Sequence, residues 1–216
     1  MDGRRSLSGN GRGEQNPAYR LSHPHTRFDH GPPCWGCWTV PATPDPRRAA
    51  RAGVPGIRSQ IIALGGFLAL SGIAWLLASV PIILNSNGWY AGSAKAPWMP
   101  PTWMFRTTWM LLYTGVAAAA WLVWRKGGLT GGTRAGYVVQ LLLNAAWPLA
   151  FFALYPMLGA AALWAAFLVI CALAATLAFL VLRFGPVDAL AGFLVLPYFS
   201  WIVFSASLNF YSAVHN

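Results

Sequence analysis

Polar and aromatic side chains recur at helical spacing in three apolar stretches of this 216-residue chain. Residues three or four positions apart, or seven or eight, lie on one face of an α-helix. Three such faces turned inward would enclose a cavity with indole and phenol walls and a few hydrogen-bonding groups, which suits a flat aromatic ligand. Alternatively, the amides only join helices. The faces are Gln140, Asn144, Trp147 and Phe151; Tyr198, Trp201, Ser205 and Asn209; and Phe105, Trp109 and Tyr113.

A loop rich in tryptophan precedes the stretch that contains Phe105, Trp109 and Tyr113. Trp89, Trp98 and Trp103 surround the pair Pro100 and Pro101. A proline pair disfavours helix before it and suits a helix start after it. The spacing therefore predicts a rigid aromatic loop that ends near residue 103 and acts as a lid. The same residue types are also typical of an aromatic belt at the membrane surface, so each tryptophan has this second interpretation.

Composition indicates a membrane protein. The chain is 56% hydrophobic and only 9% charged, with a mean hydropathy of +0.49, whereas a soluble domain is about 25% charged. Apolar stretches at 61–84, 103–124, 137–155, 158–182 and 187–211 are each close to the length that crosses a bilayer. We therefore predict an all-α membrane protein, a bundle of five transmembrane helices over 58–216. The third and fourth helices should form a tight hairpin, because only Pro156 and Met157 separate them.

Residues 1–57 differ in composition from the rest of the chain. They are rich in Arg, Gly, Pro and Ser without helical or strand periodicity, so we predict a disordered tail. The tail has no apolar core of a secretory signal, although an organelle transit sequence or translation from upstream of the true start stays open. Nine of the fifteen Lys and Arg of the chain lie in residues 1–58, which favours anionic lipid or the cytoplasm as the surroundings of the tail rather than nucleic acid.

Charge also predicts the orientation. Residues 1–58 and the loops 125–136 and 183–186 carry nine, three and one Lys or Arg, whereas the opposite side has only Lys95 and Arg106. The positive-inside rule then places the amino terminus in the cytoplasm of a bacterial cell. The one acidic residue of the membrane domain, Asp188, should cap the last helix near Arg183.

Small residues at a spacing of four suggest where helix backbones approach each other. These pairs are Gly65 and Ala69, Gly115 and Ala119, and Ala161 and Ala165.

Other site chemistries have weaker sequence support. A CxxC pair with nearby histidines lies in the tail without a second CxxC, so no metal site and no catalytic residue are expected. The five apolar segments contain no histidine, which excludes a haem held by an axial histidine. They also lack paired carboxylates. The tail residues concerned are His23, His25, His30, Cys34 and Cys37.

Five separated motifs resemble the TspO/MBR family of tryptophan-rich sensory and translocator proteins. They are WY at 89–90, KAPWMPPTW at 95–103, Trp109 with LY at 112–113, QLLLNAAWP at 140–148 with FF at 151–152, and LPYFSW at 196–201 with LN at 208–209. The resemblance covers about 61–216. It implies a five-helix bundle, commonly a homodimer, whose pocket is capped by the loop after the first helix and requires no cofactor.

The resemblance also implies ligands and site residues. Family ligands are porphyrins and other tetrapyrroles such as protoporphyrin IX, and in animal members cholesterol and aromatic drugs. The matching pocket residues are Trp109, Tyr113, Asn144, Trp147 and Trp201, and Ser205 stands where many members have Ala. The chain ends without the Lys or Arg of the proposed cholesterol motif, which disfavours sterol recognition. Three functions stay open: a sensor that binds tetrapyrrole, a transporter of tetrapyrroles or lipids and sterols, and a light-dependent porphyrin-degrading enzyme that uses Trp109 and Trp201.

Overall fold

A computed structural model describes residues 55–216. This part of the chain is helical and contains no strand. Five helices are long and apolar enough to cross a membrane, which confirms the predicted all-α membrane fold. The predicted disordered tail lies outside the described residues, except for its last three positions, and so do the CxxC pair and its histidines.

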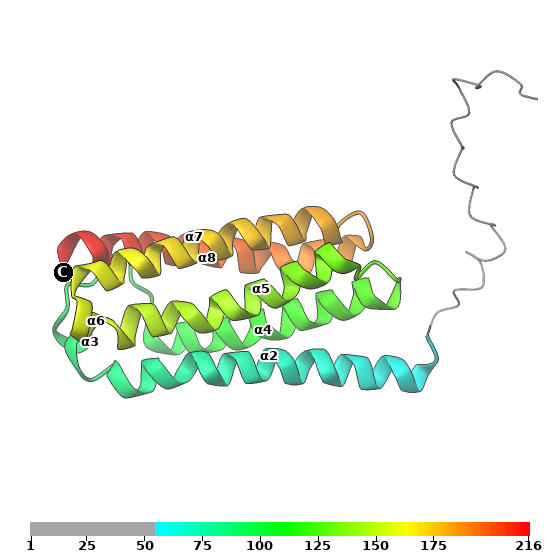
Figure 1. Ribbon diagram of the computed structural model, residues 1–216, viewed down its shortest axis with the longest axis horizontal. Helices are drawn as coiled ribbons and strands as arrows, with labels where there is room; N and C mark the ends of the chain where they lie inside the picture. Colours follow the sequence, from blue (N-terminus) through cyan, green and yellow to red (C-terminus); the bar gives the residue numbers. More distant parts are fainter. Residues whose placement is uncertain (1–54) are drawn as a thin grey trace, which may run out of the picture. The chain divides into compact units, whose positions relative to one another are not determined.

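The elements follow one another with short connections (Figure 1). Two short helices, α3 and α6, lie at one end of the bundle, and a π-helix, η1, continues α5. The bounds are α2 Ile57–Asn85, α3 Trp89–Gly92, α4 Thr102–Arg125, α5 Gly131–Pro148, η1 Leu149–Ala153, α6 Tyr155–Leu158, α7 Ala160–Phe184 and α8 Ala189–His215.

The helix bounds differ from the predicted ranges by up to six residues, at either end of a helix. The third span begins at Gly131, six residues before the predicted 137, because the Thr133 hydroxyl donates hydrogen bonds to the carbonyls of Gly128 and Thr130 and organises the first turn. The last helix runs from Ala189 to His215, beyond the predicted 187–211. The predicted hairpin turns at Gly159, whose φ of 55° favours glycine.

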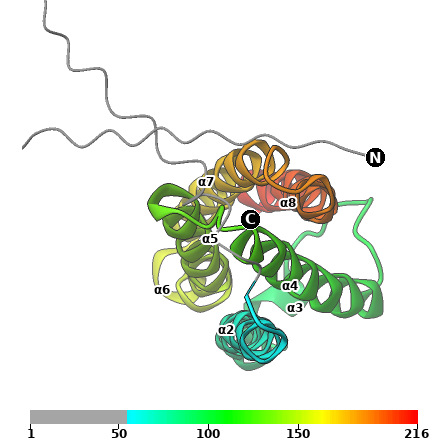
Figure 2. The same ribbon diagram turned by 90° about the vertical axis from the view of Figure 1, so that its right-hand side faces the viewer.

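The five long helices form a closed ring in the order α2, α4, α8, α7, α5 (Figure 2). Each helix buries one face in the ring. On α2 this face is narrow and consists of small residues, Ser71, Ala74, Ala78 and Pro81. On α7 and α8 it contains large residues, and Leu163, Leu177 and Tyr198 are fully buried. Many large apolar side chains point outward instead, as expected where the surroundings are lipid.

The small-residue prediction is correct for one helix and wrong for two. A Cβ on Gly115 would lie 3.6 Å from the Leu194 carbonyl oxygen, and Ala119 is fully buried, so α4 approaches α8 closely there. Gly65, Ala69, Ala161 and Ala165 are exposed instead. The close approach of α7 and α8 is made by Gly192, where a Cβ would lie 2.8 Å from the Gly185 Cα.

The amino-terminal end of α8 is held by an ion pair. The Asp188 carboxylate accepts hydrogen bonds from the backbone N–H groups of Leu190 and Ala191, which confirms its capping role. Its charged partner is Lys126, whose Nζ lies 2.9 Å from the carboxylate. The Lys126 hydrogen bond and the helix cap hold the pKa of Asp188 below its ordinary value.

Candidate functional site

Three aromatic side chains of the predicted site meet between α4 and α8. The ring centroids of Trp109 and Tyr113 are 6.0 Å apart, and Tyr198 lies 6.2 Å from Trp109 and 6.5 Å from Tyr113. Tyr113 and Tyr198 are buried, and Trp109 is half-buried. The helical spacing therefore brings two of the predicted faces together as an aromatic wall inside the ring.

The polar face of α5 also points inward. Gln140 and Asn144 are both buried, and the Asn144 Nδ2 donates a hydrogen bond of 3.2 Å to the Gln140 Oε1. Tyr137 lies one turn earlier and shares a hydrogen bond of 3.0 Å with the Ser71 hydroxyl of α2. The amide stripe thus faces the bundle interior, in line with the high cost of polar groups in lipid.

Four buried polar atoms in the described residues have no hydrogen-bond partner. They are the Nε2 of Gln140, the hydroxyl of Tyr198, the Nε1 of Trp201 and the Oγ of Ser205. Each can donate a hydrogen bond, and leaving such a group unpaired costs about 1–3 kcal/mol. All four belong to the site predicted from the sequence, and three share one face of α8.

Trp147 differs from these residues because its indole N–H is already used. It donates to the Asn209 Oδ1 at 2.9 Å, and the Asn209 Nδ2 donates to the Leu163 carbonyl at 3.0 Å. This chain of hydrogen bonds joins α5, α8 and α7. The Trp147 ring lies 5.4 Å from that of Phe151 in η1, so both residues belong to a second aromatic cluster beneath the loop.

The predicted lid residues lie at the end of the bundle that α3 and α6 occupy. Trp89 donates its indole N–H to the Phe152 carbonyl at 3.1 Å and stacks on Tyr155. Trp98 donates to the Ser207 hydroxyl at 3.3 Å. Pro101 immediately precedes the first turn of α4, as the proline pair predicts, while Trp103 is 66% exposed. The loop is therefore anchored on η1 and on α8.

Two further contacts hold the loop. The Asn216 side chain accepts from the Ala94 N–H at 2.8 Å and donates to the Ala94 carbonyl at 3.1 Å. Lys95 donates to the carbonyls of Tyr90 and Ala91. Burial raises the pKa of the Tyr90 hydroxyl above its ordinary value.

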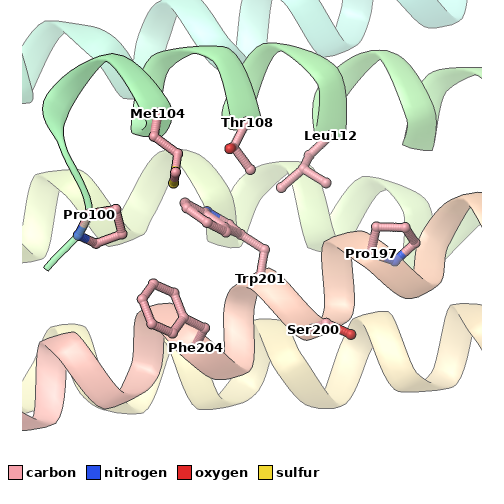
Figure 3. A pocket seen from close by; sticks show the side chains of 8 residues that line it. All are labelled: Pro100, Met104, Thr108, Leu112, Pro197, Ser200, Trp201 and Phe204. Atoms are coloured by element: carbon pink, nitrogen blue, oxygen red, sulfur yellow. The ribbon is translucent and has the colours of Figure 1, made fainter. Parts of the chain in front are cut away.

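A groove of about 520 Å³ lies between α4 and α8 (Figure 3). Of the predicted site residues, Pro100 and Trp201 line it. Figure 3 shows the Trp201 indole between the two helices, with the Met104 side chain directed toward it. The other six lining residues were not predicted from the sequence, because they do not lie on the helix faces that were expected to point inward. These six residues also recur at spacings of three and four along their helices. They are Met104, Thr108, Leu112, Pro197, Ser200 and Phe204.

The site is built for binding through rings and neutral hydrogen-bond donors. Within 55–216, no group of three His, Cys, Asp or Glu side chains is close enough to hold a metal ion. The interior groups of α4, α5 and α8 are hydroxyls, amides and indoles, whose chemistry fits a flat ligand with hydrogen-bond acceptors at its edge.

Comparisons with known proteins agree with this architecture. The chain is 30% identical over 149 residues to the translocator protein of Sus scrofa, covering 67% of this chain and 85% of that protein. It is 33% identical over 144 residues to the tryptophan-rich sensory protein of Cereibacter sphaeroides, with the same two coverages. It is 32% identical over 124 residues to the tryptophan-rich protein TspO of Archaeoglobus fulgidus, covering 56% of this chain and 76% of that protein. Residues 63–214 match the family model described as TspO/MBR, and the chain belongs to the TspO/MBR family.

Proposed function

We propose that this membrane protein binds a porphyrin-like tetrapyrrole among α4, α5 and α8, and that occupancy of this site regulates a tetrapyrrole or stress response. The observation that carries the proposal is the set of four unpaired buried donors on Gln140, Tyr198, Trp201 and Ser205. A ligand with acceptors at its edge would satisfy them and recover part of the cost of their burial. Tetrapyrroles carry such acceptors in their carboxylate side chains.

The aromatic walls favour a flat ligand. Phe105 and Phe204 lie 5.4 and 5.5 Å from the Trp201 ring, and Trp109 and Tyr198 continue the aromatic surface toward the interior. Rings at such distances bind a conjugated macrocycle through stacking and edge contacts. The names of relatives, tryptophan-rich sensory protein and translocator protein, are consistent with a membrane sensor of this kind.

Titration with protoporphyrin IX tests the proposal. The full-length protein in detergent would be compared with the double variant Trp109→Phe, Trp201→Phe, with porphyrin anisotropy as the readout and tryptophan quenching as a second signal. We expect the dissociation constant to rise at least about tenfold, or about 1.4 kcal/mol. The matched control is Trp75→Phe with Trp164→Phe, because these two tryptophans are exposed on the outside of the bundle. Equal affinity of the double variant and wild type would place the site elsewhere.

Orientation and assembly follow as part of the same proposal. Arg58, Arg125, Lys126, Arg134 and Arg183 belong to the end of the bundle at which α2 begins, and Lys95 and Arg106 to the other end. This asymmetry supports a cytoplasmic amino terminus in a bacterial cell membrane. We also propose a homodimer, to be tested by the mass of the detergent-solubilised protein in light scattering.

A further inference from the structure

The groove between α4 and α8 widens from a point of close contact toward the lid. At Gly115 the two helices approach so closely that a Cβ would lie 3.6 Å from the Leu194 carbonyl oxygen. Toward the lid they diverge, and the space of about 520 Å³ opens sideways between Pro100 and Phe204. Because both helices cross the membrane, this opening faces the acyl chains.

The floor of the groove is Trp201, which also belongs to the interior site. Its indole packs against the buried core, its Nε1 is buried without a partner, and its ring lines the groove. Ser205 lies one turn further along α8, buried and also unpaired. A rotation of the Trp201 side chain would therefore connect the groove with the unpaired donors behind it.

Two features allow such a rotation. Pro197 lies inside α8, one turn before Trp201, and a proline removes one hydrogen bond of the helix and permits bending. Met104 is the side chain directed toward the indole across the groove (Figure 3), and methionine is flexible and adapts to displaced neighbours. Only the Trp201 ring and the flexible Met104 side chain thus separate the groove from the unpaired donors in the interior.

The lid, in contrast, is tied down at several points. Hydrogen bonds join Trp89 to η1, Trp98 to α8, and Ala94 to Asn216 in both directions. A route through this end would break several of them together. We infer that the α4–α8 groove is the entrance through which a flat, lipid-soluble ligand with acceptors at its edge passes sideways from the bilayer into the interior site, with Trp201 as the gate.

This inference rests on the proposed binding function and predicts a kinetic signature. An entrance changes the barrier and not the bound state, so variants in the groove should alter association and dissociation rates equally and leave the dissociation constant unchanged. Narrowing the groove by Thr108→Phe should slow both rates about tenfold, the effect of about 1.4 kcal/mol on a barrier. Widening it by Met104→Ala should accelerate both.

The experiment is stopped-flow mixing of full-length protein in liposomes with liposomes that carry protoporphyrin IX. The matched controls are Thr114→Phe and Met110→Ala, which make the same changes at exposed positions of α4 outside the groove. A lid variant, Trp98→Phe with Asn216→Ala, should leave the rates unchanged. Unaltered rates in both groove variants, or faster rates in the lid variant, would overturn the entrance. A changed dissociation constant in the groove variants would make the groove a binding site instead. Wild-type protein that binds no porphyrin at equilibrium would overturn the proposed function, and the entrance with it.

Discussion

Trp89 donates its indole N–H to the main-chain oxygen of Phe152 at 3.1 Å, and its ring stacks on Tyr155 with centroids 3.7 Å apart. Phe152 belongs to η1, the π-helical turn that follows Pro148. A π-turn shifts the hydrogen-bond pattern of the helix and changes which carbonyls are available. One tryptophan of the loop thus fastens the loop to the distorted end of α5.

Replacing Trp89 with Phe should loosen this attachment. Phenylalanine keeps a ring against Tyr155 but cannot donate to the Phe152 carbonyl, so we expect a loss of about 1–3 kcal/mol of local stability. Hydrogen exchange of residues 89–99 should become faster, while exchange in the middle of α7 stays unchanged. Trp103→Phe serves as the control because Trp103 is 66% exposed. Equal exchange in the two variants would contradict the role of the hydrogen bond.

Tyr198 and Tyr137 allow a matched test of the unpaired donors. The hydroxyl of Tyr198 has no partner, whereas that of Tyr137 bonds to Ser71. Tyr198→Phe should raise the melting temperature, because it removes an unsatisfied group that costs about 1–3 kcal/mol, and should weaken porphyrin binding. Tyr137→Phe should lower the melting temperature and leave the affinity nearly unchanged. If Tyr198→Phe destabilises the protein as Tyr137→Phe does, then its hydroxyl is paired in solution.

Much of the fold and part of this site follow from the sequence. The length and hydropathy of the apolar stretches predict five spans, and the spacing of Gln140, Asn144 and Tyr198 predicts that they face inward. Periodicity defines a direction around each helix but not which groups meet across helices. The sequence therefore could not distinguish Trp147, whose N–H is bonded to Asn209, from Trp201, whose N–H is unpaired.

The groove between α4 and α8 and the Lys126–Asp188 ion pair could not be predicted from the sequence either, because periodicity does not show which residues of different helices meet. Met104 and Ser200 do not lie on the helix faces that were predicted to point inward, and only the placement of α4 beside α8 brings both to one groove. Arg183 is closer to Asp188 in sequence than Lys126 is, yet the ring order of the helices brings Lys126 to the carboxylate. Features that depend on the relative placement of helices require the structure.

Trp147 and Asn209 should therefore act mainly on stability. Asn209→Leu removes both the acceptor for Trp147 and the donor to the Leu163 carbonyl. Interhelical hydrogen bonds in membranes contribute about 0.6–2 kcal/mol each, so we expect a clear fall in the melting temperature. Trp147→Phe should destabilise the protein less than Asn209→Leu does. It should also reduce the porphyrin affinity less than Trp201→Phe does. An equal loss of affinity in these two tryptophan variants would show that Trp147 also bonds the ligand.

Asp188 should give the membrane domain a defined response to acid. It is the only acidic side chain in 55–216, and its pKa is held below the ordinary value of 3.8. Because the pKa of Asp188 is lower in the folded protein than in the unfolded chain, its stabilising effect is complete above the pKa of the unfolded state. The effect is lost as the pH falls through the pKa of the folded state. The melting temperature should thus stay constant down to about pH 4 and decline below it.

Two variants isolate this contribution from the carboxylates of the tail. Asp188→Asn retains an N-cap residue but cannot titrate, so its melting temperature should fall less between pH 4 and pH 2. Lys126→Gln removes the main cause of the lowered pKa and should shift the decline to higher pH. Identical acid profiles for wild type and Asp188→Asn would assign the response to other groups.

The structure also predicts that ligand reaches the site from one leaflet only. The groove runs from Pro100 in the loop along the first half of α4 to Leu112, and closes where Gly115 meets the Leu194 backbone. Beyond that point, Gly192 packs on Gly185 and the Lys126–Asp188 ion pair joins the ends of α4 and α8. A molecule that enters through the groove must therefore leave through it. Proteoliposomes with albumin trapped inside should take up external protoporphyrin IX no faster than protein-free liposomes. If the proteoliposomes instead take up porphyrin faster than protein-free liposomes, and Thr108→Phe abolishes this excess, then the protein is a transporter that uses this groove.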